Sequence, residues 1–209
     1  SVECDVLEEP ARAVADWAEN LYSNWFLADA NACWAAAAQG EWADCGYIDG
    51  PARQNEFYWH VLPTYVGSAK TTVVIVSDAL RYEVARDVAA LLERERGGNV
   101  KVSSMQAVFP SITEVGMPAL LPHQTLELAA DGSFVLADGM PTATTPQREA
   151  VLTHVEPTAR ALRSSTYLNM TGTERKALLK DSKLVYLYHN KIDATGEKAA
   201  TQDDVFGAC

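Results

Sequence analysis

A continuous apolar run, Val73–Val76, constrains the fold of this chain more than any other segment. An alternating strand has one face in water, whereas an unbroken apolar run is typical of a parallel strand covered by helices on both faces. The run is followed by Ser77 and then by an acid, Asp78. Because open α/β sheets bind ligands at the carboxyl ends of their strands, we expect Asp78 to lie at a ligand site.

Strand and helix patterns alternate from residue 69 onward, which predicts an α/β domain with a mainly parallel sheet flanked by helices. Further strands are expected at 99–109 and 183–189, and a hairpin at 124–137. Helices are expected at 82–96, from 113 to 121, from 145 to 162 with a bend at Pro157, at 173–179 and from 201.

Residues 1–68 read differently, as a helical lead-in or the end of an upstream domain. Apolar residues recur at three- and four-residue spacing between positions 10 and 40 and include Trp17, Leu21 and Trp25. This spacing predicts a helix with one apolar stripe. Such a stripe is typical of a core face rather than of a cofactor site.

Composition limits the classes of function. The chain has 17 basic and 28 acidic residues, a formal charge of −11, which argues against a nucleic-acid grip made of basic residues. It does not exclude a phosphate held by metal ions, because net charge describes the whole surface. The sequence has no apolar stretch of membrane-spanning length and no signal peptide pattern, so we expect a cytoplasmic protein without a membrane partner.

Two readings of Asp78 follow from its local sequence. An unpaired carboxylate after a buried strand is costly to desolvate unless it is hydrogen-bonded or binds a cation. The same segment, SDALRYEVA, also has the form of a helix N-cap with Glu83 nearby. This segment alone leaves the metal-ligand and capping readings open.

Thr113 also has two readings. It stands in the segment PSITEVGMPALLP, at the expected start of a helix that follows a strand. A hydroxyl there is well placed to attack a phosphorus or sulfur centre, because the helix end stabilises an anion and a divalent metal can generate the alkoxide. The alternative is an N-cap threonine followed by Glu114.

A third segment, HNKIDATGE, follows the strand expected at 183–189. If its turn is tight, Asp193, Glu197 and His189 converge on one cation. Carboxylate and imidazole both ligate zinc, and carboxylate suits manganese or magnesium. The alternative is a solvated acidic loop.

Together, the motifs VVIVSDALRYEVA, PSITEVGMPALLP and YLYHNKIDATGE resemble the PglZ family of bacterial BREX and Pgl phage-defence systems, which belongs to the alkaline phosphatase superfamily. The resemblance covers roughly residues 70–209. It implies an alkaline phosphatase-like fold with divalent metal ions, of which zinc is the first expectation and manganese or magnesium the alternatives.

Residue by residue, the resemblance implies that Asp78 is a metal ligand and that Thr113 is the metal-bound nucleophile. The superfamily binds a pair of metal ions, and Asp193 matches an Asp that holds the second of them in the phosphodiesterase branch. Glu197 stands where that branch has His, and His189 is a substitute ligand ranked below Asp193. The superfamily's later Asp-His pair and further His are missing. We therefore expect these residues to be the N-terminal part of a domain whose C-terminal part lies outside the sequence, and to bind metal weakly or not at all.

The function implied by the resemblance is a metal-dependent phosphoester hydrolase of a phage-defence system. Phosphodiesters, including nucleic acid, are the preferred substrates, and monoesters and sulfate esters remain open. Other proteins of the defence system are the expected partners. The alternative is a non-catalytic, phosphatase-like scaffold for complex assembly. A receiver-like or nucleotide-binding domain is disfavoured because neither GxGxxG nor GxxxxGK[ST] occurs in the sequence.

Overall fold

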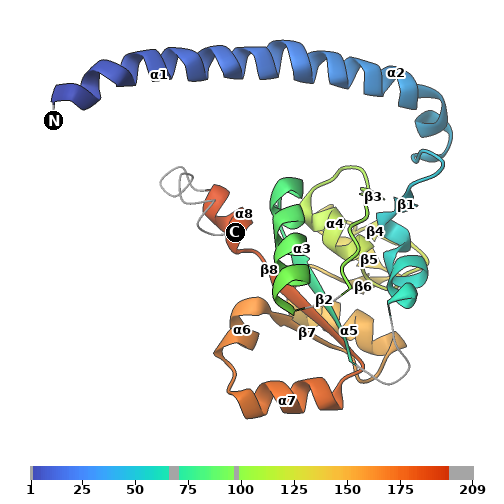
Figure 1. Ribbon diagram of the computed structural model, residues 1–209. Helices are drawn as coiled ribbons and strands as arrows, with labels where there is room; N and C mark the ends of the chain where they lie inside the picture. The colour runs from blue at the N-terminus through green and yellow to red at the C-terminus, as the bar shows by residue number, and fades with distance from the viewer. Residues whose placement is uncertain (1, 66–70, 97–98, 198–209) are drawn as a thin grey trace. The chain divides into compact units, whose positions relative to one another are not determined.

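The computed structural model describes residues 2–65, 71–96 and 99–197 (Figure 1). The chain forms two compact units, Ser1–Gly50 and Pro51–Cys209. Both the lead-in boundary predicted at residue 68 and the helix predicted from residue 201 lie outside the described residues. The boundary at residue 68 therefore stays a prediction.

The first unit is helical, as its sequence predicts. It contains α1 (Val2–Leu21), a π-helical segment (Tyr22–Leu27) and α2 (Ala28–Cys45). Within this unit the aromatic stripe is not covered, since Trp17 and Trp25 are 66% and 64% exposed, and the expectation that the stripe is a core face stays a prediction. A helix that runs through a whole unit has no neighbouring element of that unit to bury its apolar face.

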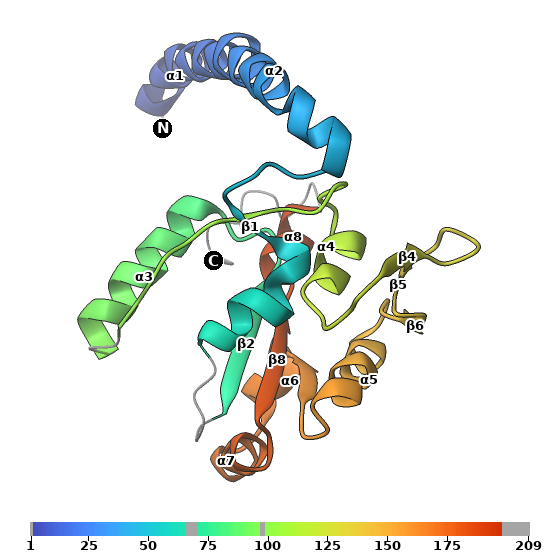
Figure 2. The same cartoon turned by 90° about the vertical axis from the view of Figure 1, so that its right-hand side faces the viewer.

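The second unit contains the predicted parallel sheet. Its strands are β2 (Thr72–Ser77), β7 (Arg160–Arg163) and β8 (Leu184–His189), in the order β2-β8-β7. Both views show β2 and β8 side by side (Figures 1 and 2). In their register Thr72 pairs with Leu184 and Ser77 with His189, so the two strands end at the same edge. The mixed α/β class is confirmed.

The core lies around the central strand β8. Residues 184–188 are all buried, and Tyr186 is fully buried. The outer strand β2 differs, because Val73 and Ile75 are 41% and 65% exposed while Val74 and Val76 pack against the core. The prediction that helices cover both faces of β2 is therefore wrong for the described residues, whereas β8 has the burial expected of such a strand.

Between β2 and β7 the chain adds helices and a small antiparallel sheet. The predicted helices are present as α3 (Tyr82–Arg96) and α4 (Thr113–Ala119). The predicted hairpin forms from β4 (Leu126–Leu128) and β5 (Val135–Ala137), joined by β6 (Met140–Pro141). The strand predicted at 99–109 is reduced to β3 (Met105–Gln106), which pairs with β1 (Ala52–Arg53). Most of that segment is exposed, so it gains little by joining a sheet.

Helix α5 (Thr145–Val155) ends earlier than predicted. Thr144 and Gln147 form a capping box at its start, and Glu156 is its C-cap. Pro157 has no N–H and its ring blocks a preceding helical turn, so the chain leaves the helix and forms β7. The helix predicted to continue to residue 162 is therefore wrong beyond Val155.

Three short helices complete the described fold. Helix α6 (Ser164–Asn169) is not predicted, whereas α7 (Gly172–Asp181) confirms the helix expected at 173–179. Helix α8 (Lys191–Gly196) replaces the turn expected after β8. In the parts of the chain that the structure describes, no helix combines the length and apolarity needed to cross a bilayer.

Candidate active site

Three of the predicted site residues meet at the carboxyl edge of the parallel sheet. Asp78 follows β2, Thr113 begins α4 and Asp193 lies in α8, and all three line one pocket of about 310 Å³. This is the edge at which open α/β sheets bind their ligands. The parallel register of β2 and β8 brings the segments of Asp78 and Asp193 together.

Asp78 continues the β2–β8 ladder by one residue, because its backbone N–H donates to the carbonyl of His189 over 2.9 Å. The next residue, Ala79, has a φ of +59°, a left-handed conformation that turns the chain away from the strand. Helix α3 begins only at Tyr82, so Asp78 is not placed to cap it. Its carboxylate is half-buried and lines the pocket instead.

Thr113 contacts Asp78 directly. Its Oγ1 donates to Oδ2 of Asp78 over 3.1 Å, although the two residues are 35 positions apart. The N-cap of α4 is Ile112, which makes no side-chain capping bond. The Thr113 hydroxyl is therefore not used as a helix cap, and the hydrogen bond holds it at the pocket beside a carboxylate.

Asp193 lies near other acidic residues, and their charges affect the pKa of its carboxyl. Burial, then the negative charges of Asp78, Glu197 and Glu114, raise the pKa of its carboxyl above the usual value. A second carboxylate nearby disfavours ionisation of the first. The pocket therefore holds two acids whose repulsion a cation would relieve.

His189 and Glu197 are not among the residues that line this pocket. Nδ1 of His189 is 2.9 Å from Oγ of Ser77, on the neighbouring strand. Glu197 is exposed at the end of α8, and its N–H donates to the carbonyl of Asp193. Their assignment as metal ligands stays a prediction.

Several lining residues escaped prediction. Arg148 enters from α5, Arg163 ends β7, and Tyr188 and Asn190 flank the end of β8. Arg163 was missed because its strand, RALR, lies in a segment that the sequence pattern mostly assigned to a helix. Tyr188 and Asn190 carried a usable signal, because they flank the end of a strand that the sequence does predict.

Arg148 is the most constrained of these residues. Its Nε donates to the carbonyl of Thr142 over 2.8 Å, and its Nη1 lies 3.0 Å from the sulfur of Met117. The guanidinium carbon stands 4.8 Å from the ring centre of Tyr188, a cation–π distance. Arg148 thus brings a fixed positive charge to a pocket that also holds two aspartates.

The donor atoms fit a divalent cation. Carboxylate oxygens of Asp78 and Asp193 are hard ligands of the kind that magnesium, manganese and zinc accept, and Thr113 adds a hydroxyl. Across the described ranges, no three His, Cys, Asp or Glu side chains are grouped closely enough to hold a metal. The two aspartates are the acids that the described part of the pocket offers.

Comparisons with known proteins cover the part of the chain that contains this pocket. Residues 57–209 match the BREX system PglZ alkaline phosphatase-like domain. The chain is 37% identical over 202 residues to the alkaline phosphatase-like protein BrxZ of Escherichia coli O9:H4 strain HS, and 32% identical over 197 residues to the alkaline phosphatase-like protein PglZ of Bacillus cereus strain H3081.97. These alignments cover 95% and 94% of the chain but 23% of each relative. No solved structure matches the chain.

Proposed function

Because this chain belongs to the PglZ family of alkaline phosphatase-like proteins, we propose that it carries part of the active site of a metal-dependent phosphoester hydrolase in phage defence. The observation that carries the proposal is the hydrogen bond from Thr113 to Asp78, in a pocket shared with Asp193. The chain spans about a quarter of the length of its curated relatives, and the proposed activity is that of a protein as long as these relatives.

In this proposal, Thr113 is the nucleophile and Asp78 orients it. The 3.1 Å hydrogen bond fixes Oγ1 at the pocket and gives its proton an acceptor, Oδ2 of Asp78. A bond from Oγ1 to phosphorus forms as the bond from phosphorus to the leaving oxygen breaks, so the phosphoryl group is transferred to the threonine. Hydrolysis of that phosphothreonine then restores the hydroxyl.

Asp78 and Asp193 would each hold a divalent metal ion of a pair, with zinc, manganese and magnesium as the candidates. When bound, the metal supplies Lewis-acid stabilisation of phosphoryl oxygens and lowers the pKa of a coordinated hydroxyl. The raised pKa of Asp193, caused by burial and by Asp78, supports this role, because repulsion between neighbouring acids is what cation binding removes.

Two arginines suit an anionic substrate. Arg163 is exposed at the pocket, and Arg148 is held by the carbonyl of Thr142. Guanidinium groups bind phosphate oxygens with good geometry. Phosphodiesters, including nucleic acid, are the proposed substrate class.

The test uses a full-length protein that contains this sequence, with nitrophenyl phosphate and bis-nitrophenyl phosphate as substrates and zinc, manganese or magnesium added in turn. Thr113→Ala should lower metal-dependent turnover by about 1,000-fold or more, whereas Thr113→Ser should retain part of it. Thr173→Ala, an exposed threonine in α7, is the matched control. Unchanged turnover in Thr113→Ala would reject the nucleophile, and no turnover in the unaltered protein would favour the scaffold alternative.

A further inference from the structure

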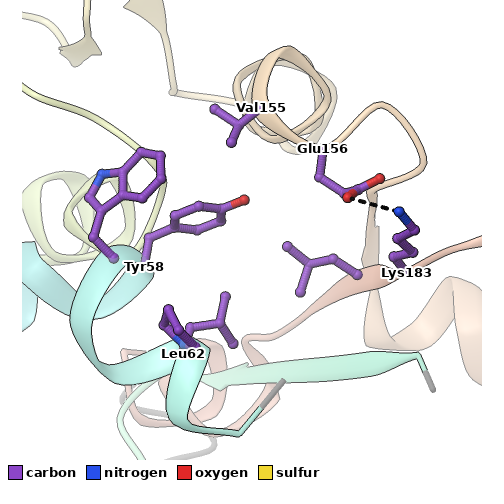
Figure 3. Close-up of a pocket in the computed structure, with 8 residues that line it drawn as sticks. Tyr58, Leu62, Val155, Glu156 and Lys183 are labelled. Carbon is purple, nitrogen blue, oxygen red and sulfur yellow. Dashed lines mark ion pairs between the residues drawn. The ribbon is translucent and has the colours of Figure 1, made fainter. Parts of the chain in front are cut away.

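A second pocket, of about 460 Å³, lies at the opposite end of the same elements (Figure 3). Leu184, the first residue of β8, and Val155, the last of α5, line it. The proposed active site instead involves Tyr188 and the start of α5. At about 3.3 Å per residue, the four steps from Leu184 to Tyr188 separate the pockets by roughly 13 Å along β8.

The walls of this pocket are apolar and fixed. Leu62 and Leu184 are each 5% exposed and belong to the core cluster. The indole Nε1 of Trp59 donates to the carbonyl of His123 over 3.1 Å, which fixes the ring. Tyr58 and Trp59 meet edge to face, with ring centres 4.9 Å apart. The pocket is thus preformed, with an aromatic corner on one side.

One carboxylate at the rim is held in place. Oε1 of Glu156 accepts hydrogen bonds from the N–H and the hydroxyl of Thr158 over 3.2 and 2.8 Å. The hydroxyl bond lowers the pKa of this carboxyl, so Glu156 stays ionised at neutral pH. Figure 3 shows the Tyr58 hydroxyl directed across the pocket toward Glu156.

The cation that now faces Glu156 is held loosely. Nζ of Lys183 lies 3.9 Å from Oε2 of Glu156, beyond hydrogen-bond length, and the Lys183 side chain is 78% exposed. An exposed ion pair of this kind is weak. Oε2 of Glu156 is therefore open to a cation that makes a true hydrogen bond.

We propose that this pocket binds a segment of a partner polypeptide in which an arginine neighbours an apolar side chain. The guanidinium displaces Lys183 from Glu156, and the apolar side chain fills the space against Leu62 and Leu184. Charge complementarity selects the arginine, because the fixed charge at the rim is negative and its present counter-charge is displaceable.

Arginine fits better than other basic groups. Its planar guanidinium stacks on aromatic faces while it donates a hydrogen bond to Oε2 of Glu156, and Tyr58 and Trp59 supply such faces beside the carboxylate. A pocket of about 460 Å³ also exceeds the volume of one side chain, which leaves room for the apolar neighbour. Trp59 and Val155 are 42% and 43% exposed, so the pocket is accessible from outside.

The test titrates the isotope-labelled chain with acetyl-Phe-Arg-amide and follows the indole N–H resonance of Trp59. The matched probes are acetyl-Phe-Glu-amide, which reverses the charge, and acetyl-Gly-Arg-amide, which removes the apolar group. The arginine peptide should give a saturable shift, and each matched probe should bind at least about tenfold more weakly, a difference of 1.4 kcal/mol.

Two variants carry opposite expectations. Glu156→Gln should weaken binding of acetyl-Phe-Arg-amide about tenfold, while Lys183→Met should strengthen it several-fold by removing the competing cation. Lys183 is exposed, so its replacement leaves the fold intact. Glu127→Gln, an exposed acid in β4, is the control and should change nothing.

Three results would overturn the proposal: no saturable shift with the arginine peptide, equal or tighter binding of the glutamate peptide, or indifference to both variants. A Trp59 shift that depends on protein concentration without peptide would assign the pocket to a second copy of this chain instead. Sedimentation of the unliganded protein checks that outcome.

Discussion

Thr113 donates its hydroxyl hydrogen to Oδ2 of Asp78 over 3.1 Å, across 35 positions of sequence. This bond joins the end of β2 to the start of α4, two segments that share no strand pairing. The bond therefore connects two segments that line the pocket, and it also orients the hydroxyl.

The energy of this bond can be measured with a double-mutant cycle on the whole chain. Thr113→Val should lower the free energy of unfolding, and this loss should shrink by the energy of the bond when Asp78→Ala is already present. We expect a coupling of about 1 kcal/mol, typical of an intramolecular hydrogen bond. Urea unfolding gives the four values. Additivity within about 0.3 kcal/mol would show that the bond is not formed in solution.

The crowding of acids predicts a titration. In the folded protein, burial and Asp78 raise the pKa of Asp193, so its carboxyl holds its proton more tightly than in the unfolded chain. The contribution of Asp193 to stability is thus greatest below the usual pKa of an aspartate and is lost as pH rises through the raised pKa. Carbon NMR of the Asp193 carboxyl should show this raised midpoint.

Asp78→Asn should move that midpoint downward, because the amide removes the largest electrostatic cause of the shift. A divalent metal that binds Asp193 should move it in the same direction, since a cation favours the ionised form. Glu127→Asn, in the hairpin, serves as a control for the loss of one acid. If the pKa of Asp193 is the same in Asp78→Asn as in the unaltered protein, Asp78 does not lie close enough to Asp193 to raise its pKa.

The core predicts a contrast between two leucines. Leu152 in α5 is fully buried, whereas Leu128 in β4 is 67% exposed. Leu152→Ala should cost about 2–5 kcal/mol of unfolding free energy, through lost burial and the cavity left behind. Leu128→Ala should stay within about 0.5 kcal/mol. Chemical denaturation of both variants tests the burial pattern, and similar losses would contradict it.

Two tyrosines on one strand predict opposite responses to the same change. The Tyr186 hydroxyl donates to the carbonyl of Leu120 over 2.9 Å, whereas the buried Tyr188 hydroxyl has no hydrogen-bond partner within the described ranges. Tyr186→Phe should therefore cost about 1 kcal/mol, and Tyr188→Phe should be neutral or stabilising. A large loss in Tyr188→Phe would indicate that its hydroxyl has a partner in solution.

The dependence of stability on alkaline pH provides a second test of the environment of Tyr188. Burial raises the pKa of this phenol from 10.0 to about 12, although Arg148 acts in the opposite direction. The unfolded chain loses its proton first, so stability falls as pH rises from about 10 toward 12. Tyr188→Phe should make this part of the stability curve flatter. The difference between the two pH profiles isolates its contribution.

The sequence predicted the elements whose signals are local. The strand at 183–189 and the helix at 82–96 have patterns that need no distant partner, and both are confirmed. The turn of the hairpin predicted at 124–137 is similar, since Gly132 has the positive φ of +71° that glycine adopts freely. Asp78, Thr113 and Asp193 were identified because each follows or begins such an element.

The elements that escaped prediction depend on tertiary contacts. Strand β7 reads as helix because its length is only four residues, and it becomes a strand by pairing with β8. The exposure of Val73 and Ile75 depends on which elements cover β2, a property that the apolar run does not encode. Arg148 reaches the pocket because the carbonyl of Thr142 holds it, a contact without a sequence pattern.

The division of the chain at Gly50 also divides its charge. The first 50 residues contain ten acidic residues and one basic residue, Arg12, a balance of −9. Residues 51–209 contain 18 acidic and 16 basic residues, a balance of −2. The strongly acidic character of the protein is thus concentrated in its first unit. The unit with the pocket is nearly neutral, so its overall charge sets no large barrier to the approach of a polyanion.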